Sequence, residues 1–292
     1  FFMSLSGFLL RVVKLNKRIY YKGLNIFVLR QINSKINTTY VSMSVICIML
    51  MLTISILATS AGFNTTAKEV IDKNAPYDVT YVTQRPTDSD PGMPQILKDA
   101  GIDSQTYFRD MHSFSLYECD ALYESLLRPY DDILPDTMAD WYLENPLWAI
   151  RLSDYNRLLK MQGKDIMVLG DGEFGLASNI NSMMGIANRI LKEGSATITI
   201  GGVPLTVADI PLQTAQPFNA SNPAIDLMLI LPDHIDSGLT AGNHIFAALF
   251  NGDPETTENQ LMALQPKIDA IAQQYGVTYY SMSAIEVYEI RF

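Results

Sequence analysis

One long apolar run dominates the hydrophobic pattern of this chain. The stretch from Val41 to Phe63 has 23 residues and no charge, and it lies within a longer uncharged run from Ile36 to Ala67. As a helix rising ~1.5 Å per residue it would extend about 34 Å, enough to cross a hydrocarbon core of roughly 30 Å. A buried core helix rarely runs this long without a polar face. The pattern therefore predicts a transmembrane helix over residues 41–63.

A second, amphipathic pattern precedes this run. Apolar residues recur at every fourth position, at Leu24, Val28, Ile32 and Ile36, and basic and amide side chains lie mostly on the other faces. This pattern predicts an amphipathic segment on the cytoplasmic membrane surface within residues 14–40, where its basic groups meet anionic lipid. The alternative is an ordinary basic flank of a membrane helix.

The first residues of the chain are apolar as well. Residues 1–10 carry no charge, but ten helical residues span only ~15 Å and cannot cross a bilayer. We interpret residues 1–13 as the end of a preceding transmembrane helix, and the sequence as a fragment of a longer membrane protein.

After the long apolar run the pattern changes to short strand-like segments alternating with amphipathic ones. The expected strands are residues 77–84, 114–117, 147–152, 166–169, 174–178, 196–200, 224–231, 244–250 and 277–282. The expected helices are one capped by Ser153 and ending at Lys160, one capped by Asn179 or Asn181 and ending at Leu191, and one starting at Asp253-Pro254-Glu255. Residues 64–292 are therefore predicted to form a mixed α/β domain, undivided or in two lobes with a boundary near residues 85–95.

Charge gives the helix a direction. Residues 1–40 carry seven basic residues and no acid, whereas the chain from residue 64 onward has a formal charge of −17. Because short basic flanks are retained in the cytoplasm, the predicted domain at 64–292 is expected outside the cell membrane. The two cysteines, Cys47 and Cys119, fall in the predicted membrane helix and the outer domain, so no intrachain disulfide framework is expected.

Motifs for catalysis are weak throughout the chain. The stretch Gly170–Gly175 matches G-x-G-x-x-G, but Asp171 and Glu173 would place carboxylates where a pyrophosphate binds, so we predict a hairpin turn there. The sequence has no G-x-x-x-x-G-K-[ST] motif, and its three histidines lack the spacing of metal ligands. We expect no enzyme activity, no catalytic residues, no cofactor, no metal and no nucleic-acid partner.

The stretch from Arg128 to Trp148 is the most informative polar region, because acids alternate there with amphipathic rings and both tryptophans of the chain lie in it. The candidate ligand-recognition residues are Tyr130, Asp131, Asp132, Asp136, Asp140, Trp141 and Tyr142. Acids attract cations and rings bind apolar groups, so the stretch suits a cationic, partly apolar ligand. The alternative is a loop with solvated acids whose rings anchor it to the core.

Several segments carry a resemblance to a known family. They are YYKGLNIFVLRQINSKINTTYVSMSVICIMLMLTISIL around the long apolar run, NAPYDVTYV at 74–82, LSDYNRLLKMQGKDIMVL at 152–169 and DGEFGLASNINSMMGI at 171–186. With these the chain resembles the permease subunit of FtsX-like ABC transporters, in the branch that confers bacitracin resistance. Residues 86–150 and 203–260 are interpreted without the resemblance.

The resemblance implies a function and partners. In such permeases a separate ATPase drives movement that the membrane helices pass to an extracellular domain, and the branch frees cell-wall lipid targets from peptide antibiotics, often with a sensor histidine kinase. The ligand would be a cationic peptide or a lipid-linked cell-wall precursor. Candidate coupling residues at the cytoplasmic entry to the helix are Arg30, Gln31, Asn33 and Lys35. For these four, contact with membrane lipid headgroups is the alternative role.

A second function is compatible with the same architecture. A permease of this kind can activate an extracellular cell-wall hydrolase or move lipoproteins, and no residue of the sequence separates that use from peptide resistance. A membrane-anchored enzyme is a third class with no supporting motif.

The charge asymmetry predicts the topology. In a cysteine-free version of the full-length protein, single cysteines at Ser34 and Ser221 should lie on opposite sides of the membrane. An impermeant thiol reagent applied to intact cells should label only position 221. Labelling of position 34 in unbroken cells would contradict the orientation and the extracellular assignment.

Overall fold

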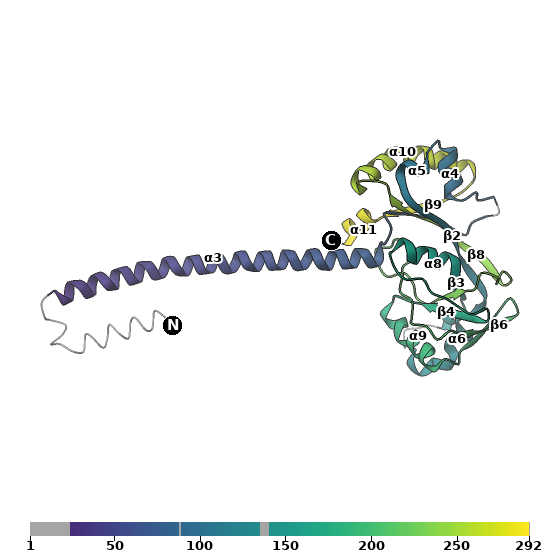
Figure 1. Ribbon diagram of the computed structural model, residues 1–292, viewed down its shortest axis with the longest axis horizontal. Helices are drawn as coiled ribbons and strands as arrows, with labels where there is room; N and C mark the ends of the chain where they lie inside the picture. Colours follow the sequence, from purple (N-terminus) through teal and green to yellow (C-terminus); the bar gives the residue numbers. More distant parts are fainter. Residues whose placement is uncertain (1–23, 88, 135–139, 292) are drawn as a thin grey trace. The chain divides into compact units, whose positions relative to one another are not determined.

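The computed structural model describes residues 24–87, 89–134 and 140–291 (Figure 1). Contacts divide the chain into two compact units, one up to Thr66 and one from Ala67 onward, which we call the outer unit. The predicted end of a preceding transmembrane helix at residues 1–13, and the amphipathic segment up to residue 23, lie outside the described residues.

A single helix, α3, runs for 50 residues from Asn25 to Asn74. Its stretch Ser42–Ser60 has a mean hydropathy of 2.2 and makes no buried contact, so it is long and apolar enough to cross a membrane. Within it, the Thr53 hydroxyl donates to the Met49 carbonyl at 2.8 Å, so this polar group is satisfied inside the helix. The predicted helix over 41–63 is confirmed as a helix, and it extends further at both ends.

The outer unit is built on one mixed sheet. Among the described residues its strands are β1 (Val79–Gln84), β2 (Phe108–Leu122), β3 (Pro146–Arg151), β4 (Glu173–Ala177), β5 (Thr197–Ile200), β6 (Val203–Val207), β7 (Met228–Leu231), β8 (Leu239–Phe250) and β9 (Tyr279–Ser283). Their order across the sheet is β5-β6-β4-β7-β3-β2-β8-β1-β9. The pairs β3–β7 and β4–β6 are parallel and the other pairs antiparallel, which confirms the predicted mixed α/β class.

Short helices cover the sheet. They are α4 (Met93–Asp99), α5 (Ser104–Tyr107), α6 (Tyr123–Leu127), the 3-10 helix η1 (Arg128–Ile133), α7 (Asp140–Leu143), α8 (Leu152–Met161), α9 (Asn181–Glu193), α10 (Pro254–Gln274) and α11 (Ala284–Arg291). Helices α4, α5 and α10 gather around the β1–β9 side of the sheet, and α6 and α9 around the other side (Figure 1). Each group has its own apolar core, and α8 covers a third one beside β3 and β8.

Two local predictions near residue 170 are wrong. Residues 166–169 form no strand, because the Asn156 side chain bonds both the N–H and the carbonyl of Met167 at 2.8 Å and so replaces a strand neighbour. The turn within Gly170–Gly175 is consequently not a hairpin turn: it precedes β4, which pairs with β6 and β7. The local sequence does not predict the Asn156–Met167 hydrogen bonds or the pairing of β4 with β6 and β7.

Strand β6 was not predicted, although a local signal marks it. Gly201 and Gly202 form a two-residue turn with φ of 58° and 82°, and this turn joins β5 to β6 as a hairpin. Two consecutive residues in the left-handed region favour glycine strongly, so a Gly-Gly pair between β-rich segments is itself a hairpin signal.

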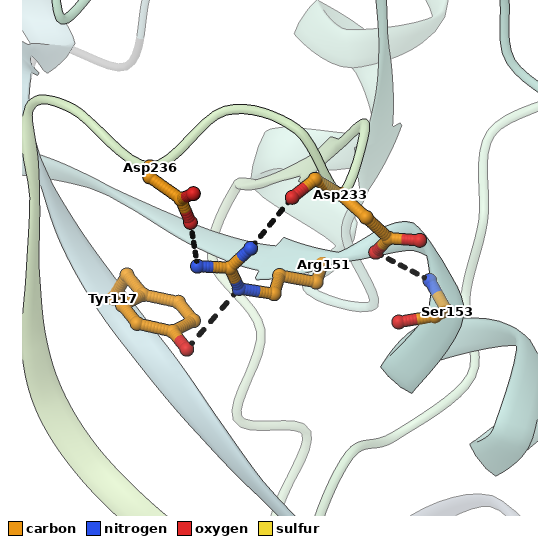
Figure 2. A network of polar contacts seen from close by, with 5 residues as sticks. All are labelled: Tyr117, Arg151, Ser153, Asp233 and Asp236. Atoms are coloured by element: carbon orange, nitrogen blue, oxygen red, sulfur yellow. Dashed lines mark hydrogen bonds and ion pairs between the residues drawn. The ribbon is translucent and has the colours of Figure 1, made fainter.

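Helix starts were predicted with mixed success. Asp253 caps α10 as expected, with its carboxylate accepting from the Thr256 N–H at 2.9 Å. The expected caps of α8 and α9 are wrong: α8 follows Arg151 and α9 follows Ile180, and neither of these residues makes a side-chain cap. For α8 the cap comes from elsewhere, since the Asp233 carboxylate accepts from the Ser153 N–H at 3.1 Å (Figure 2).

The same corner contains Arg151, whose side chain makes three hydrogen bonds within the chain. Arg151 donates to the Tyr117 hydroxyl at 3.3 Å, to the Asp233 carbonyl at 2.7 Å and to the Asp236 carboxylate at 2.6 Å (Figure 2). Tyr117 and Asp236 raise the pKa of Arg151 by accepting these bonds. Since its donors are engaged within the chain, this cluster fixes the turn after β7 and is structural.

The core assignment predicts a contrast between two isoleucines. Ile150 is fully buried in β3, whereas the side chain of Ile166 is 52% exposed. Ile150→Ala should lower the free energy of unfolding by about 2–5 kcal/mol, because it leaves a cavity in packed surroundings. Ile166→Ala should change it by less than about 0.5 kcal/mol. Urea unfolding in detergent micelles, followed by near-UV circular dichroism, measures both. Equal effects would contradict the described core.

Candidate functional site

A pocket of about 350 Å³ opens on the outer unit beside both tryptophans. Its aromatic lining is Tyr123, Trp141, Tyr142, Trp148 and Phe218, and its one carboxylate among the described residues is Asp226. These residues come from α6, α7, β3 and the irregular segment that precedes β7. An apolar pocket with few polar groups is the usual form of a ligand site.

The Trp148 ring packs closely against the backbone of Gly242. A Cβ at Gly242 of β8 would lie 2.5 Å from Trp148 Cη2, closer than any side chain can approach. Any other residue at position 242 would therefore force the indole or the strand to shift. The ring is half-buried, and one part of it faces the pocket.

Two stacked tyrosines, Tyr123 and Tyr142, form another part of the pocket lining. The Tyr123 and Tyr142 rings stack with centroids 4.7 Å apart. The Tyr123 hydroxyl donates to the Leu227 carbonyl at 2.9 Å, which ties this part of the lining to the segment before β7. Burial raises the pKa of both hydroxyls, so both stay neutral at physiological pH.

Trp141 stands at the edge of the pocket and is 67% exposed. It meets the Tyr142 ring edge-on, with centroids 6.2 Å apart. The Asn145 side chain donates to the Trp141 carbonyl at 2.9 Å and fixes its backbone. An indole held on short helix α7 yet open to solvent is available for contact with a ligand.

The one carboxylate that lines the pocket is uncompensated among the described residues. The Asp226 carboxylate makes no ion pair there. Although Asp226 is exposed overall, partial loss of hydration raises the pKa of its carboxyl. An uncompensated carboxylate beside aromatic rings attracts an organic cation, and the rings bind the apolar part of the same molecule.

The predicted recognition residues fall into different environments. Trp141 and Tyr142 line the pocket, whereas Tyr130 is buried in the core and Asp132 pairs with Arg189 at 2.7 Å. The side chains of Asp131 and Asp140, and all of Asp136, lie outside the described residues. The structure thus brings together two of the seven predicted residues and adds Trp148 from the same stretch.

The candidate coupling residues all lie in α3. The side chain of Gln31 is exposed, and the side chains of Arg30, Asn33 and Lys35 are not among those described. Their proposed role therefore stays a prediction.

Sequence reasoning missed Tyr123, Phe218 and Asp226, which come from segments distant in the chain. One signal existed for Asp226: it is the lone charged residue within the expected strand 224–231. A single acid in an otherwise apolar segment is costly to bury and therefore marks a site or a surface. No comparable pattern marks Tyr123 or Phe218.

Two chemical features bear on reactivity among the described side chains, namely clusters of metal ligands and free thiols. Among the described residues, no group of three or more histidine, cysteine or acidic side chains could hold a metal. Cys119 is buried, and burial raises the pKa of its thiol to about 12, so it is not a nucleophile at neutral pH.

Comparisons with models of protein families, with curated proteins and with solved structures found no match for this chain. The pocket is a candidate binding site, and α3 contains a stretch that is long and apolar enough to cross a membrane.

The unpaired carboxylate gives a pH-dependent prediction. Because the folded protein raises the pKa of Asp226, ionisation of this group destabilises the fold at neutral pH, and the penalty disappears as pH falls to the unfolded value of about 3.9. Asp226→Asn should therefore raise Tm at pH 7, with a gain that shrinks towards pH 4. Asp165→Asn, at an exposed acid outside the pocket, is the control and should show no such trend. A gain for Asp226→Asn that is absent or independent of pH would contradict this environment.

Proposed function

We propose that the chain is part of a permease subunit of an FtsX-like ABC transporter, and that its outer unit captures cationic, partly apolar ligands such as antimicrobial peptides. The observation that carries the proposal is α3, one unbroken helix from the apolar span into the first turns of the outer unit. The proposal gives α3 the role of passing movement from the apolar span to the outer unit.

The proposal places Ser42–Ser60 in a membrane. Three features support this: the mean hydropathy of 2.2, the lack of buried contacts, and threonine hydroxyls bonded back to the helix. In a bilayer every polar group must be satisfied within the protein, and these hydroxyls are. The basic residues before the span and the −17 charge after it support an extracellular outer unit.

Energy would come from a partner. The sequence lacks a Walker-type phosphate loop, so a separate ATPase subunit supplies ATP hydrolysis in this proposal. The resemblance adds a sensor histidine kinase as a further partner and membrane lipid as the surrounding medium. The chain itself acts without catalysis and without a cofactor.

The ligand class follows from the pocket. Five aromatic rings around one carboxylate suit a primary amine or guanidinium attached to an apolar group. Cation–π contact contributes roughly 0.5–2 kcal/mol, and burial of one large apolar side chain roughly 1.5–3 kcal/mol. The acidic charge of the outer unit attracts cations over about 8 Å at physiological salt, so it speeds capture while the rings retain the ligand.

Binding by the full chain in lipid nanodiscs tests the proposal. The probe is a short amidated peptide of alternating lysine and leucine, and the matched peptide with glutamate for lysine is its control. Trp141→Ala should weaken binding at least tenfold, mainly through faster dissociation. Because Trp141 is 67% exposed, the variant should keep the wild-type Tm. Asp226→Asn should mainly slow association and flatten the salt dependence. Surface plasmon resonance gives both rates.

Asp132→Asn separates the pocket from the acidic stretch around it. Asp132 pairs with Arg189 and does not line the pocket, so its variant should bind within about twofold of wild type. Weakening by Asp132→Asn without weakening by Trp141→Ala or Asp226→Asn would move the site to the acidic stretch. Equal binding of the lysine and glutamate peptides, or of neither, would contradict the proposed ligand class.

A further inference from the structure

An irregular segment, residues 216–227, connects the pocket with the two ends of the outer unit. We call it the strap. It has no helix or strand and leads directly into β7. One part of it lines the pocket, and another part is hydrogen-bonded to the residues through which the chain enters and leaves the outer unit.

Two stretches of the strap line the pocket, Pro217 with Phe218 and residues 224–227, which include Ile225 and Asp226. Ile225 is buried in the neighbouring core, and the half-buried Phe218 packs against that core as well as lining the pocket. A ligand that contacts the rings and the carboxylate of Asp226 therefore contacts the strap at two separated positions.

The other side is held by a buried amide. The Asn219 Nδ2 group donates to the Tyr77 carbonyl at 2.7 Å and to the Met282 carbonyl at 3.0 Å, and its Oδ1 accepts from the Tyr77 N–H at 3.2 Å. Asn219 is 1% exposed. Tyr77 lies between α3 and β1, and Met282 lies in β9, so one side chain joins the entering and leaving segments.

Backbone and charged contacts extend this connection. The Ala220 N–H donates to the carbonyl of Asn74, the last residue of α3, at 2.9 Å. Arg291, at the end of α11, donates to the Ser221 carbonyl at 2.9 Å and to the Asn222 side chain. Five consecutive residues beginning at Pro217 thus pass from the pocket lining to the end of α3 and then to α11.

One group of the strap is unsatisfied. Gln216 is 1% exposed, and its side-chain Nε2 has no hydrogen-bond partner among the described residues. Its backbone carbonyl accepts from the Tyr77 hydroxyl at 3.1 Å and from the Gln162 side chain at 2.9 Å. A buried amide donor without a partner is costly. A shift of the strap that gives this donor a partner would recover that cost.

We infer that the strap couples occupancy of the aromatic pocket to the two ends of the outer unit, with Phe218 and Asp226 receiving the ligand and Asn219 acting as the positioning residue that transmits the change. This inference rests on the proposed function. It adds a stated route from the ligand to α3, along which movement can pass in either direction. The coupling free energy is the same in both directions. An input that displaces Asn74 therefore changes the free energy of ligand binding by the amount by which ligand binding favours that displacement.

Hydrogen exchange measured by mass spectrometry tests the route in the full chain in lipid nanodiscs, with the lysine–leucine peptide as probe. In wild type, saturating peptide should slow exchange at least twofold in residues 75–84 and 279–291, beyond the strap itself. Helix α4 contacts neither pocket nor strap, so it should not change. A uniform slowing that includes α4 would reflect general stabilisation by the ligand and would contradict a specific route.

Variants then separate coupling from binding. Asn219→Ala should bind the peptide within about threefold of wild type but lose most of the exchange response at 75–84 and 279–284. Pro223→Ala, at an exposed strap position that does not line the pocket, should respond as wild type does. Asn219→Ala with an undiminished response would overturn the route through Asn219.

The outcomes also distinguish this inference from the proposed function. Peptide binding without any response at the two ends overturns the inference and leaves the binding site intact, whereas absence of binding overturns both. If Asn219→Ala does not fold, Arg291→Ala removes only the exposed contact with Ser221 and Asn222. That variant should keep the response at 75–84 and lose it at residues 284–291, and a full response there would contradict the strap's link to α11.

Discussion

A buried amide, that of Asn219, holds the entering and leaving ends of the outer unit together, and the other functional features depend on this tie. Its three bonds to Tyr77 and Met282 reinforce the antiparallel pairing of β1 with β9 at one end of the sheet. A buried asparagine satisfied in this way specifies one arrangement, because any other register leaves polar groups unpaired. The chain therefore enters and leaves the outer unit at neighbouring positions.

In the proposed function, the overall charge attracts the ligand from a distance and the pocket contacts it at short range. A formal charge of −17 beyond residue 64 favours the approach of cations, but exposed charges are screened and give little discrimination. In the proposed function, selectivity for an apolar cation rests on short-range contact with Trp141, Trp148 and the unpaired Asp226, which line the pocket. Acids such as Asp132, already paired with Arg189, contribute less, since a ligand would have to compete with that partner.

The sequence predicted those elements that depend mainly on interactions between residues close together in the chain. The long uncharged run, the Asp253 cap and most strands follow from periodicity and composition, and the structure confirms them as elements. Errors arose where a distant residue intervenes: Asn156 occupies the backbone of Met167, and Asp233 caps α8 in place of Ser153. The same limit applies to the site. Clustering of both tryptophans was visible in sequence, whereas the approach of Phe218 and Asp226 depends on strand order, which no local pattern encodes.

The two tryptophans permit a direct test of the central claim, because both line the pocket and the chain contains no others. Labelled with 5-fluorotryptophan, the full chain in nanodiscs should give two ¹⁹F resonances. Titration with the lysine–leucine peptide should shift both with a single common Kd, while the glutamate peptide should shift neither. Peptide binding detected by another method without movement of either resonance would contradict the assignment of this pocket as the ligand site.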